Sequence, residues 1–111
     1  MKIDNFDTYV VLADDHDDLK EFAGFLEYQI LKKFKGQNVV INLLDYPALK
    51  LEELLYFLKT SNAHRATKQS FVLVTSALDP DTIPVELMVV PTLQEAADVI
   101  EMEEIERDLG F

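Results

Sequence analysis

Three short apolar runs constrain the fold of this chain more than any other feature of its sequence. They cover residues 39–44, 71–74 and 88–90. Each run is too short for a helix. The β-branched residues of the first two are typical of strands buried on both faces of a sheet, and the third predicts a short strand. Longer stretches with helical periodicity separate the runs. Strands that alternate with helices predict an α/β fold with a mostly parallel sheet and right-handed crossovers.

The first two predicted helices carry apolar residues at three- and four-residue steps, which is the spacing of one helical face, whereas the apolar residues of the last form no single clean stripe beyond Ile100. The first helix covers about residues 18–35, the second about 50–63 and the last about 93–109. Asp17 or Asp18 can cap the start of the first helix, and Gly36 ends it. The residues expected to face the core in the first two helices are Leu19, Phe22, Ala23, Leu26, Ile30 and Phe34, then Leu51, Leu54, Leu55 and Leu58.

The remaining segments complete one domain. Residues 1–5 and 9–13 predict a hairpin, and residues 79–87 allow one short helix. The predicted order is therefore β-β-α-β-α-β-(α)-β-α in a single domain, because 111 residues are a common length for one domain. The hairpin adds one antiparallel edge strand to an otherwise parallel sheet, with helices packed on it.

The composition excludes several classes of function. The formal net charge is −11, and Arg65 and Arg107 are the only arginines, whereas nucleic acids and anionic membranes bind clusters of basic residues. The chain has no Cys for thiol chemistry and no Gly-rich loop for a phosphate group. Its first seven residues lack the basic and apolar blocks typical of a signal peptide, and no apolar run approaches the ~20 residues of a membrane span. We expect a cytoplasmic, non-enzymatic protein without a cofactor, a nucleic-acid partner or a membrane partner.

Acidic residues gather where the predicted strands end. Asp14 and Asp15 follow the second strand, Asp45 and Tyr46 follow the third, and Thr75 follows the fourth. The carboxyl ends of parallel strands share one edge of the sheet, where ligands and partners bind in open α/β folds. This edge predicts an electrostatic docking surface for a basic partner or a divalent-cation site. Helix capping and solubility are the alternative reason for acids at these positions.

The element order and several stretches resemble the STAS domain, the fold of the anti-sigma-factor antagonists. The resemblance spans about residues 9–100: the strand that runs into an acidic loop, residues 38–43, the Leu-rich second helix, residues 71–74 and the strand and helix at 89–96. It implies a non-enzymatic regulatory domain that binds a protein partner, such as a kinase-type anti-sigma factor. Together with the acidic edge, it predicts a partner-binding surface of Asp14, Asp15, Asp45, Tyr46, Lys50, Leu51, Glu52 and Glu53.

The phosphorylation motif of that family is degenerate in this chain. The resemblance implies a phosphorylated serine at the start of the second helix, but no Ser or Thr occurs between Leu43 and Lys59. Glu52 stands there instead and carries one permanent negative charge. We therefore hypothesise a fixed site without a phosphorylation switch. Glu52 and Glu53 are also ordinary first-turn helix residues, which is the simpler interpretation.

Two other functions remain as alternatives. Asp14, Asp15, Asp45 and Thr75 are similar in pattern to the magnesium-binding phosphoacceptor site of a response-regulator receiver domain. Two departures weaken that similarity: only one predicted helix separates Asp15 from Asp45, and Val90 stands where the family has a lysine. The chain is alternatively an accessory subunit of a larger enzyme, contributing contacts and no chemistry.

Two further surfaces are candidates for interfaces. Four aromatic residues flank the apolar faces of the first two helices: Phe25, Tyr28, Tyr56 and Phe57. They either form an interface in a homodimer or heteromer, or cover the core from a wide angle. Residues 98–108 hold six acids and one base. They form a solvated helix face, or the last two turns project with Phe111 and dock on a basic groove.

Overall fold

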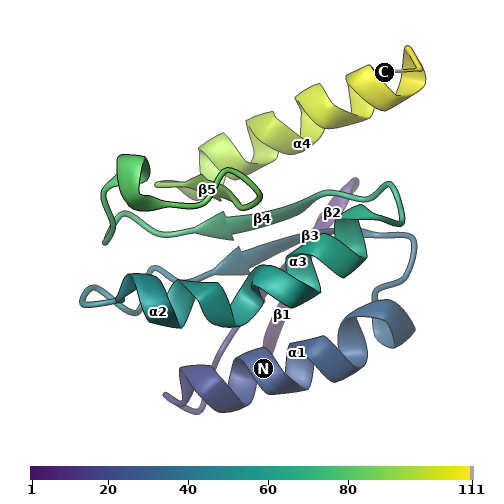
Figure 1. Ribbon diagram of the computed structural model, residues 1–111. Helices are drawn as coiled ribbons and strands as arrows, with labels where there is room; N and C mark the ends of the chain where they lie inside the picture. The colour runs from purple at the N-terminus through teal and green to yellow at the C-terminus, as the bar shows by residue number, and fades with distance from the viewer. Residues whose placement is uncertain (111) are drawn as a thin grey trace.

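The computed structural model, which describes residues 1–110, contains a five-stranded sheet in the order β1-β2-β3-β4-β5 (Figure 1). The strands are β1 (Lys2–Asn5), β2 (Tyr9–Ala13), β3 (Asn38–Asn42), β4 (Phe71–Val74) and β5 (Met88–Val90). β1 pairs antiparallel with β2, and every other pair is parallel. The predicted α/β fold with a mixed, mostly parallel sheet is confirmed.

Helices cover both faces of this sheet. One face carries α1 (Leu19–Lys33) and a second, continuous helical segment. That segment consists of α2 (Leu51–Leu54), a 3-10 turn η1 (Leu55–Phe57) and α3 (Leu58–Arg65). α4 (Leu93–Asp108) lies alone on the other face and contacts β3, β4 and β5 (Figure 1). A second 3-10 turn, η2 at Pro80–Thr82, precedes β5. No helix within residues 1–110 is both long and apolar enough to cross a membrane.

The first helix follows its sequence pattern closely. Asp18 is the N-cap, and its Oδ1 accepts a hydrogen bond from the Glu21 backbone N–H at 3.1 Å. Lys32 and Lys33 occupy the last turn, where cations interact favourably with the helix dipole. All six residues predicted to face the core from this segment are buried, and Phe34 follows directly after the helix. Gly36 ends the segment with a φ of +78°, which a glycine adopts without steric cost.

The second predicted helix is not one regular α-helix. The structure divides it at η1, and Leu55, expected in the core, is 38% exposed. Leu54 and Phe57 are buried instead, at a three-residue step that matches the tighter 3-10 geometry, and Thr60 and Ser61 continue the buried side into α3. Phe57 therefore belongs to the core, where its ring meets Phe22 edge to face at 6.2 Å between centroids. Tyr56 stays 40% exposed.

The two faces of the sheet bury cores of unequal size. The face under α1 and α3 buries alternate strand residues such as Leu12, Ile41 and Leu73 against both helices. The face under α4 buries mainly valines of four strands against two buried residues of the helix, Ala96 and Ile100, and the half-buried Val99. Apolar packing thus explains only part of how α4 is held.

Polar contacts at the amino ends of the strands also hold α4 against the sheet. Asn38, at the start of β3, is 4% exposed, and its Nδ2 donates to the Thr8 carbonyl at 2.9 Å and to Glu104 Oε1 at 2.6 Å. Its Oδ1 accepts from the Ser70 backbone N–H at 2.8 Å and from Arg107 Nη2 at 3.2 Å. One asparagine thereby joins β2, β3, the start of β4 and two turns of α4.

Glu103 makes the second half of this arrangement. Its Oε2 accepts from Arg65 Nη2 at 2.7 Å, and its Oε1 accepts from Ser70 Oγ at 2.6 Å. Arg107 Nη1 also donates to Ser70 Oγ, at 3.3 Å. We call this group the amino-edge network; its members are Asn38, Arg65, Ser70, Glu103, Glu104 and Arg107.

The network corrects the expectation that the last turns of α4 project freely. Glu103, Glu104 and Arg107 fasten those turns to the sheet, so the acids of this helix are not uniformly a solvated face. Phe111, which that expectation included, lies outside the described residues.

Candidate functional site

The parallel pairing of β2, β3 and β4 brings the predicted site residues to one edge of the sheet. Asp14 and Asp15 follow β2, Asp45 and Tyr46 follow β3 after a short turn, and Thr75 follows β4. We call this the carboxyl edge. It consists of the loop at residues 14–18, the segment 45–53 and the loop that begins at Thr75.

Asp14 organises the loop between β2 and α1. Its Oδ1 accepts from the His16 backbone N–H at 3.0 Å, and its Oδ2 accepts from the Asp18 backbone N–H at 2.9 Å. The Tyr46 hydroxyl donates to the same Oδ2, which ties this loop to the segment after β3. Asp17 accommodates the turn with a φ of +53°.

These contacts shift the pKa values of both partners. Burial opposes ionisation of Asp14, but the hydrogen bonds from Tyr46, His16 and Asp18 outweigh it, so the pKa of the carboxyl lies below its usual value. Burial, followed by the hydrogen bond and the charge of Asp14, raises the pKa of the Tyr46 hydroxyl. Near neutral pH the pair is therefore a phenol that donates to a carboxylate.

Asp15 binds the start of the chain. Its Oδ1 lies 2.6 Å from the Met1 amine and 3.3 Å from His16 Nε2. The hydrogen bond from the amine lowers the pKa of the Asp15 carboxyl. The contact fastens the beginning of β1 to the 14–18 loop, so Asp15 points toward the N-terminus and Asp14 points toward Tyr46.

The segment 45–53 is a compact turn that leads into α2. The Lys50 backbone N–H donates to Glu53 Oε1 at 2.9 Å, and the Glu53 N–H donates to the Lys50 carbonyl at 3.0 Å. Leu51 is half-buried against the core, while Lys50 and Glu52 are exposed. Of the predicted residues here, Leu51 thus serves packing and Glu52 faces solvent.

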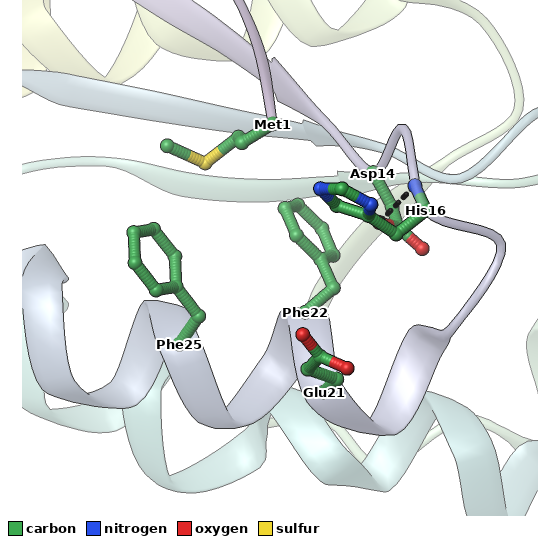
Figure 2. Close-up of a pocket in the computed structure, with 6 residues that line it drawn as sticks. All are labelled: Met1, Asp14, His16, Glu21, Phe22 and Phe25. Atoms are coloured by element: carbon green, nitrogen blue, oxygen red, sulfur yellow. Dashed lines mark hydrogen bonds between the residues drawn. The ribbon is translucent and has the colours of Figure 1, made fainter.

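Two hollows adjoin the 14–18 loop of the carboxyl edge, and a third, of about 240 Å³, lies beside Thr75 and Ser76. The larger, of about 520 Å³, lies between the N-terminus and α1, and Phe22 and Phe25 point into it toward Met1 (Figure 2). Asp14, His16 and Glu21 complete its lining. The smaller, of about 300 Å³, is lined by Asp17, Asp45, Tyr46, Pro47, Ala48, Leu49 and Glu53.

Sequence reasoning identified part of these linings. Asp45, Tyr46 and Glu53 share the smaller hollow as predicted neighbours, whereas the apolar wall of the larger one was not foreseen. The sequence places Phe25 only beside the core stripe of the first helix, and the structure leaves it 44% exposed at this hollow. Met1 carried no sequence signal, because its place depends on the pairing of β1 with β2.

Three of the four residues of the magnesium alternative, Asp14, Asp15 and Thr75, make other contacts. Both oxygens of Asp14 accept backbone N–H groups, and Thr75 is 5% exposed with its Oγ1 accepting from the Ala77 N–H at 3.1 Å. Within residues 1–110, no three His, Asp or Glu side chains are grouped so that they could hold a metal ion.

Comparison with known proteins informs the fold. No protein-family model and no curated protein sequence matches the chain. Among solved structures, the NMR structure of the protein TM1081 is similar, with a TM-score of 0.67 and 16% sequence identity over 89% of this chain and 86% of that one. At this identity the likeness concerns the fold alone.

Proposed function

We propose that the chain is a non-enzymatic protein-interaction domain of the anti-sigma-factor antagonist type, with the carboxyl edge as its docking surface. The observation that carries this proposal is the contrast among the acids of that edge. Asp14 and Asp15 brace the fold through internal hydrogen bonds. Within residues 1–110, no amine, Lys, Arg or His lies within salt-bridge distance of Asp17, Asp45 or Glu52, while Glu53 accepts only the backbone N–H of Lys50.

The shape and charge of this surface support a protein partner with basic residues. Asp17, Asp45 and Glu53 surround the smaller hollow, whose floor includes Pro47, Ala48 and the buried Leu49. A Lys or Arg side chain of a partner can place its apolar stem in such a hollow and its charge among the carboxylates. Glu52 extends the acidic surface onto the first turn of α2.

The lack of a Ser or Thr at the start of the second helix determines how we expect binding to be regulated. Without a Ser or Thr between Leu43 and Lys59, the charge at this part of the edge is permanent. Binding is then controlled by the supply of the partner, which we expect to be a kinase-type anti-sigma factor. Phosphate mapped to residues 43–59 after incubation with that kinase would contradict the fixed charge.

Capture of the partner tests the docking proposal. The tagged protein is immobilised and exposed to a lysate of its native host at low salt, and bound proteins are identified by mass spectrometry. We expect an ATP-binding, kinase-like protein whose retention needs no magnesium and falls as salt rises to about 0.5 M. The double variant Asp45→Asn/Glu52→Gln should lose it, while Glu86→Gln, an exposed acid before β5, should retain it.

Other outcomes of this experiment favour the alternatives. Recovery of an enzyme that is not a kinase, in a fixed ratio, favours an accessory subunit. Magnesium-dependent stabilisation of the isolated protein that disappears in Asp45→Asn favours the receiver-like function, because a ligand bound to the native state raises its stability. Retention that depends neither on salt nor on Asp45 and Glu52 contradicts docking through the carboxyl edge.

A further inference from the structure

The outward side of α4 carries an apolar stripe that nothing within residues 1–110 covers. Met102, Ile105 and Leu109 are 64%, 52% and 66% exposed. They recur at three- and four-residue steps, so they share one side of the helix. Ala96 and Ile100, which pack on the sheet, lie on the opposite side. Figure 1 shows α4 as the outermost element of its face of the sheet. We call these three residues the outer stripe.

Acidic side chains frame the outer stripe on both sides. Glu101 and Asp108 lie along one flank and Glu106 along the other, and all three are exposed. Arg107 is the only base of α4, and it turns inward to Ser70 and Asn38. Within the described chain, no basic group lies within salt-bridge distance of these flanking acids. The surface is therefore an apolar stripe with a purely acidic border.

The amino-edge network presents this stripe on a fixed support. Glu103, Glu104 and Arg107 hold the same two turns of α4 to β3 and to the residue before β4. A partner that docks on the stripe meets a helix that is already ordered, which lowers the entropic cost of association.

The charge of the border selects the partner. A second copy of this chain would bring the same acidic flanks together, and each copy has a formal net charge of −11, so self-association is opposed. An anionic lipid surface is repelled for the same reason. A helix with apolar residues at heptad spacing and Lys or Arg beside them is complementary in shape and in charge. Its apolar residues fit between those of the stripe, and its basic residues face the acidic flanks.

We propose that the outer stripe of α4 binds an amphipathic, basic-flanked helix of a protein partner. This interface is separate from the carboxyl edge and involves none of its residues. The domain then joins two partners, one at each surface, and the two proposals can fail independently because each is mapped to its own residues.

An NMR titration of the full-length, isotope-labelled protein tests the outer stripe. The probe is a synthetic helical peptide with Leu at heptad positions and Lys on both flanks, and a matched peptide has Glu in place of Lys. We expect the Lys-flanked peptide to shift the amide signals of residues 98–109, and the Glu-flanked peptide to leave them unchanged.

Matched variants separate the stripe from general charge attraction. Met102→Gln/Ile105→Gln should weaken binding of the Lys-flanked peptide about tenfold or more, as expected for loss of apolar contacts at the centre of an interface. Leu31→Gln removes an apolar residue of α1 that is 42% exposed and should leave the affinity unchanged. Signals that stay unchanged away from each substituted position show that both variants fold.

Four outcomes would overturn the proposal. The first is amide-signal shifts that are confined to residues 14–18 and 45–53. The second is equal affinity of the double variant and the parent protein for the Lys-flanked peptide. The third is self-association of the parent protein in sedimentation experiments that the double variant abolishes. The fourth is binding to vesicles of mixed phosphatidylserine and phosphatidylcholine that requires Met102 and Ile105, which would assign the stripe to a lipid surface.

Discussion

The same residue types are buried and paired at one end of the parallel sheet and exposed at the other. At the amino ends of the strands, Arg65 pairs with Glu103, Arg107 donates to Ser70, and a buried asparagine meets Glu104. At the carboxyl ends, Asp17 and Asp45 line an open hollow. The two histidines divide likewise: His64 is fully buried beside the amino end of β3, and the side chain of His16 is 74% exposed at the carboxyl end of β2.

This difference separates the acids that stabilise the fold from the acids that are free to bind. A carboxylate with buried partners contributes to the free energy of unfolding and cannot also serve a partner without loss of that contribution. A solvated carboxylate contributes little to stability, and its charge remains available for association. The amino edge is thus the structural end of the sheet, and the carboxyl edge is the end we propose for recognition.

The two asparagines of β3 test this contrast most strongly. Asn38 makes four hydrogen bonds at the amino end, whereas Asn42 at the carboxyl end accepts one, from the Leu44 N–H at 3.0 Å. Asn38→Ala should cost about 3 kcal/mol of unfolding free energy, because it leaves buried groups unpaired, and Asn42→Ala about 1 kcal/mol. Urea denaturation measures both values. Equal losses would mean that the two ends contribute alike.

The sequence predicted the sheet well because its signals are local. Short β-branched runs located β3, β4 and β5, and the periodicity of residues 19–34 identified the buried side of α1. The second helix was predicted less well. Leu55 and Phe57 are both apolar, and only the tighter turn at η1 determines which of them meets the sheet.

The amino-edge network was beyond sequence reasoning because its contacts are not local. Glu104 and Asn38 are 66 positions apart, and Glu103 and Arg65 are 38 apart. The acids of α4 looked alike in the sequence, and the sheet packing selects which of them turn inward. By contrast, the carboxyl edge was predictable, because parallel strands necessarily bring their following loops together, although the Asp14–Tyr46 hydrogen bond was not.

Glu103 supplies the next largest effect and a pH dependence. Burial raises its pKa, but hydrogen bonds from Arg65 and Ser70 and the charges of both arginines outweigh burial, so the pKa lies below its ordinary value of 4.5. Its contribution is present above that value and is lost as the pH falls through the folded-state pKa. Glu103→Gln should cost about 2 kcal/mol near neutral pH, less than a fully buried pair, with the difference shrinking in acid.

A solvated ion pair provides the matched control for that variant. Glu27 lies 2.8 Å from Lys59, with side chains that are 47% and 81% exposed, and Glu27→Gln should cost less than about 0.5 kcal/mol. Urea denaturation from neutral to acidic pH gives both curves. A Glu103→Gln curve parallel to that of the parent protein would contradict the role of the carboxylate.

His64 adds a smaller effect in a higher pH range. Its Nε2 lies 2.7 Å from the Gln37 carbonyl, which can only accept, so Nε2 carries the proton. Burial lowers the pKa of the ring below its ordinary value of 6.5, against the opposing effect of that hydrogen bond. As the pH falls below 6.5, the unfolded chain takes up a proton that the folded chain does not, so stability is present above 6.5 and declines in acid.

The exposed His16 provides a control for the prediction about the buried His64. The free energy of unfolding should fall by up to about 1.4 kcal/mol per pH unit below the ordinary His pKa, and His64→Gln should remove that slope. His16→Gln, at the exposed site, should retain it. Measurements between about pH 7.5 and 5.5 stay above the range in which Glu103 titrates. Loss of the slope in the His16 variant instead would reverse the assignment.

Tyr46 has a structural role at the carboxyl edge, as its partner Asp14 does, and removal of its hydroxyl should have a modest effect. Tyr46→Phe deletes the hydrogen bond to Asp14 and keeps the ring, so we expect a loss of about 1 kcal/mol. The link between the 14–18 loop and the 45–53 segment should also loosen, which amide hydrogen exchange at His16 and Asp18 detects as faster exchange. Tyr56→Phe, at a 40% exposed position, is the control and should change neither quantity.

The smallest expected effect on stability is the most informative one for function. Asp45→Asn and Glu52→Gln remove charges that no base within the described residues balances, so each should change the free energy of unfolding by less than about 0.5 kcal/mol. Removing like charge from a chain of net charge −11 can even stabilise it slightly. If these neutral substitutions abolish partner capture while Glu103→Gln preserves it at a temperature where that variant is folded, binding and stability belong to opposite ends of the sheet. If Asp45→Asn instead destabilises the fold as much as Glu103→Gln, the carboxyl edge is structural too, and its acids are not free for a partner.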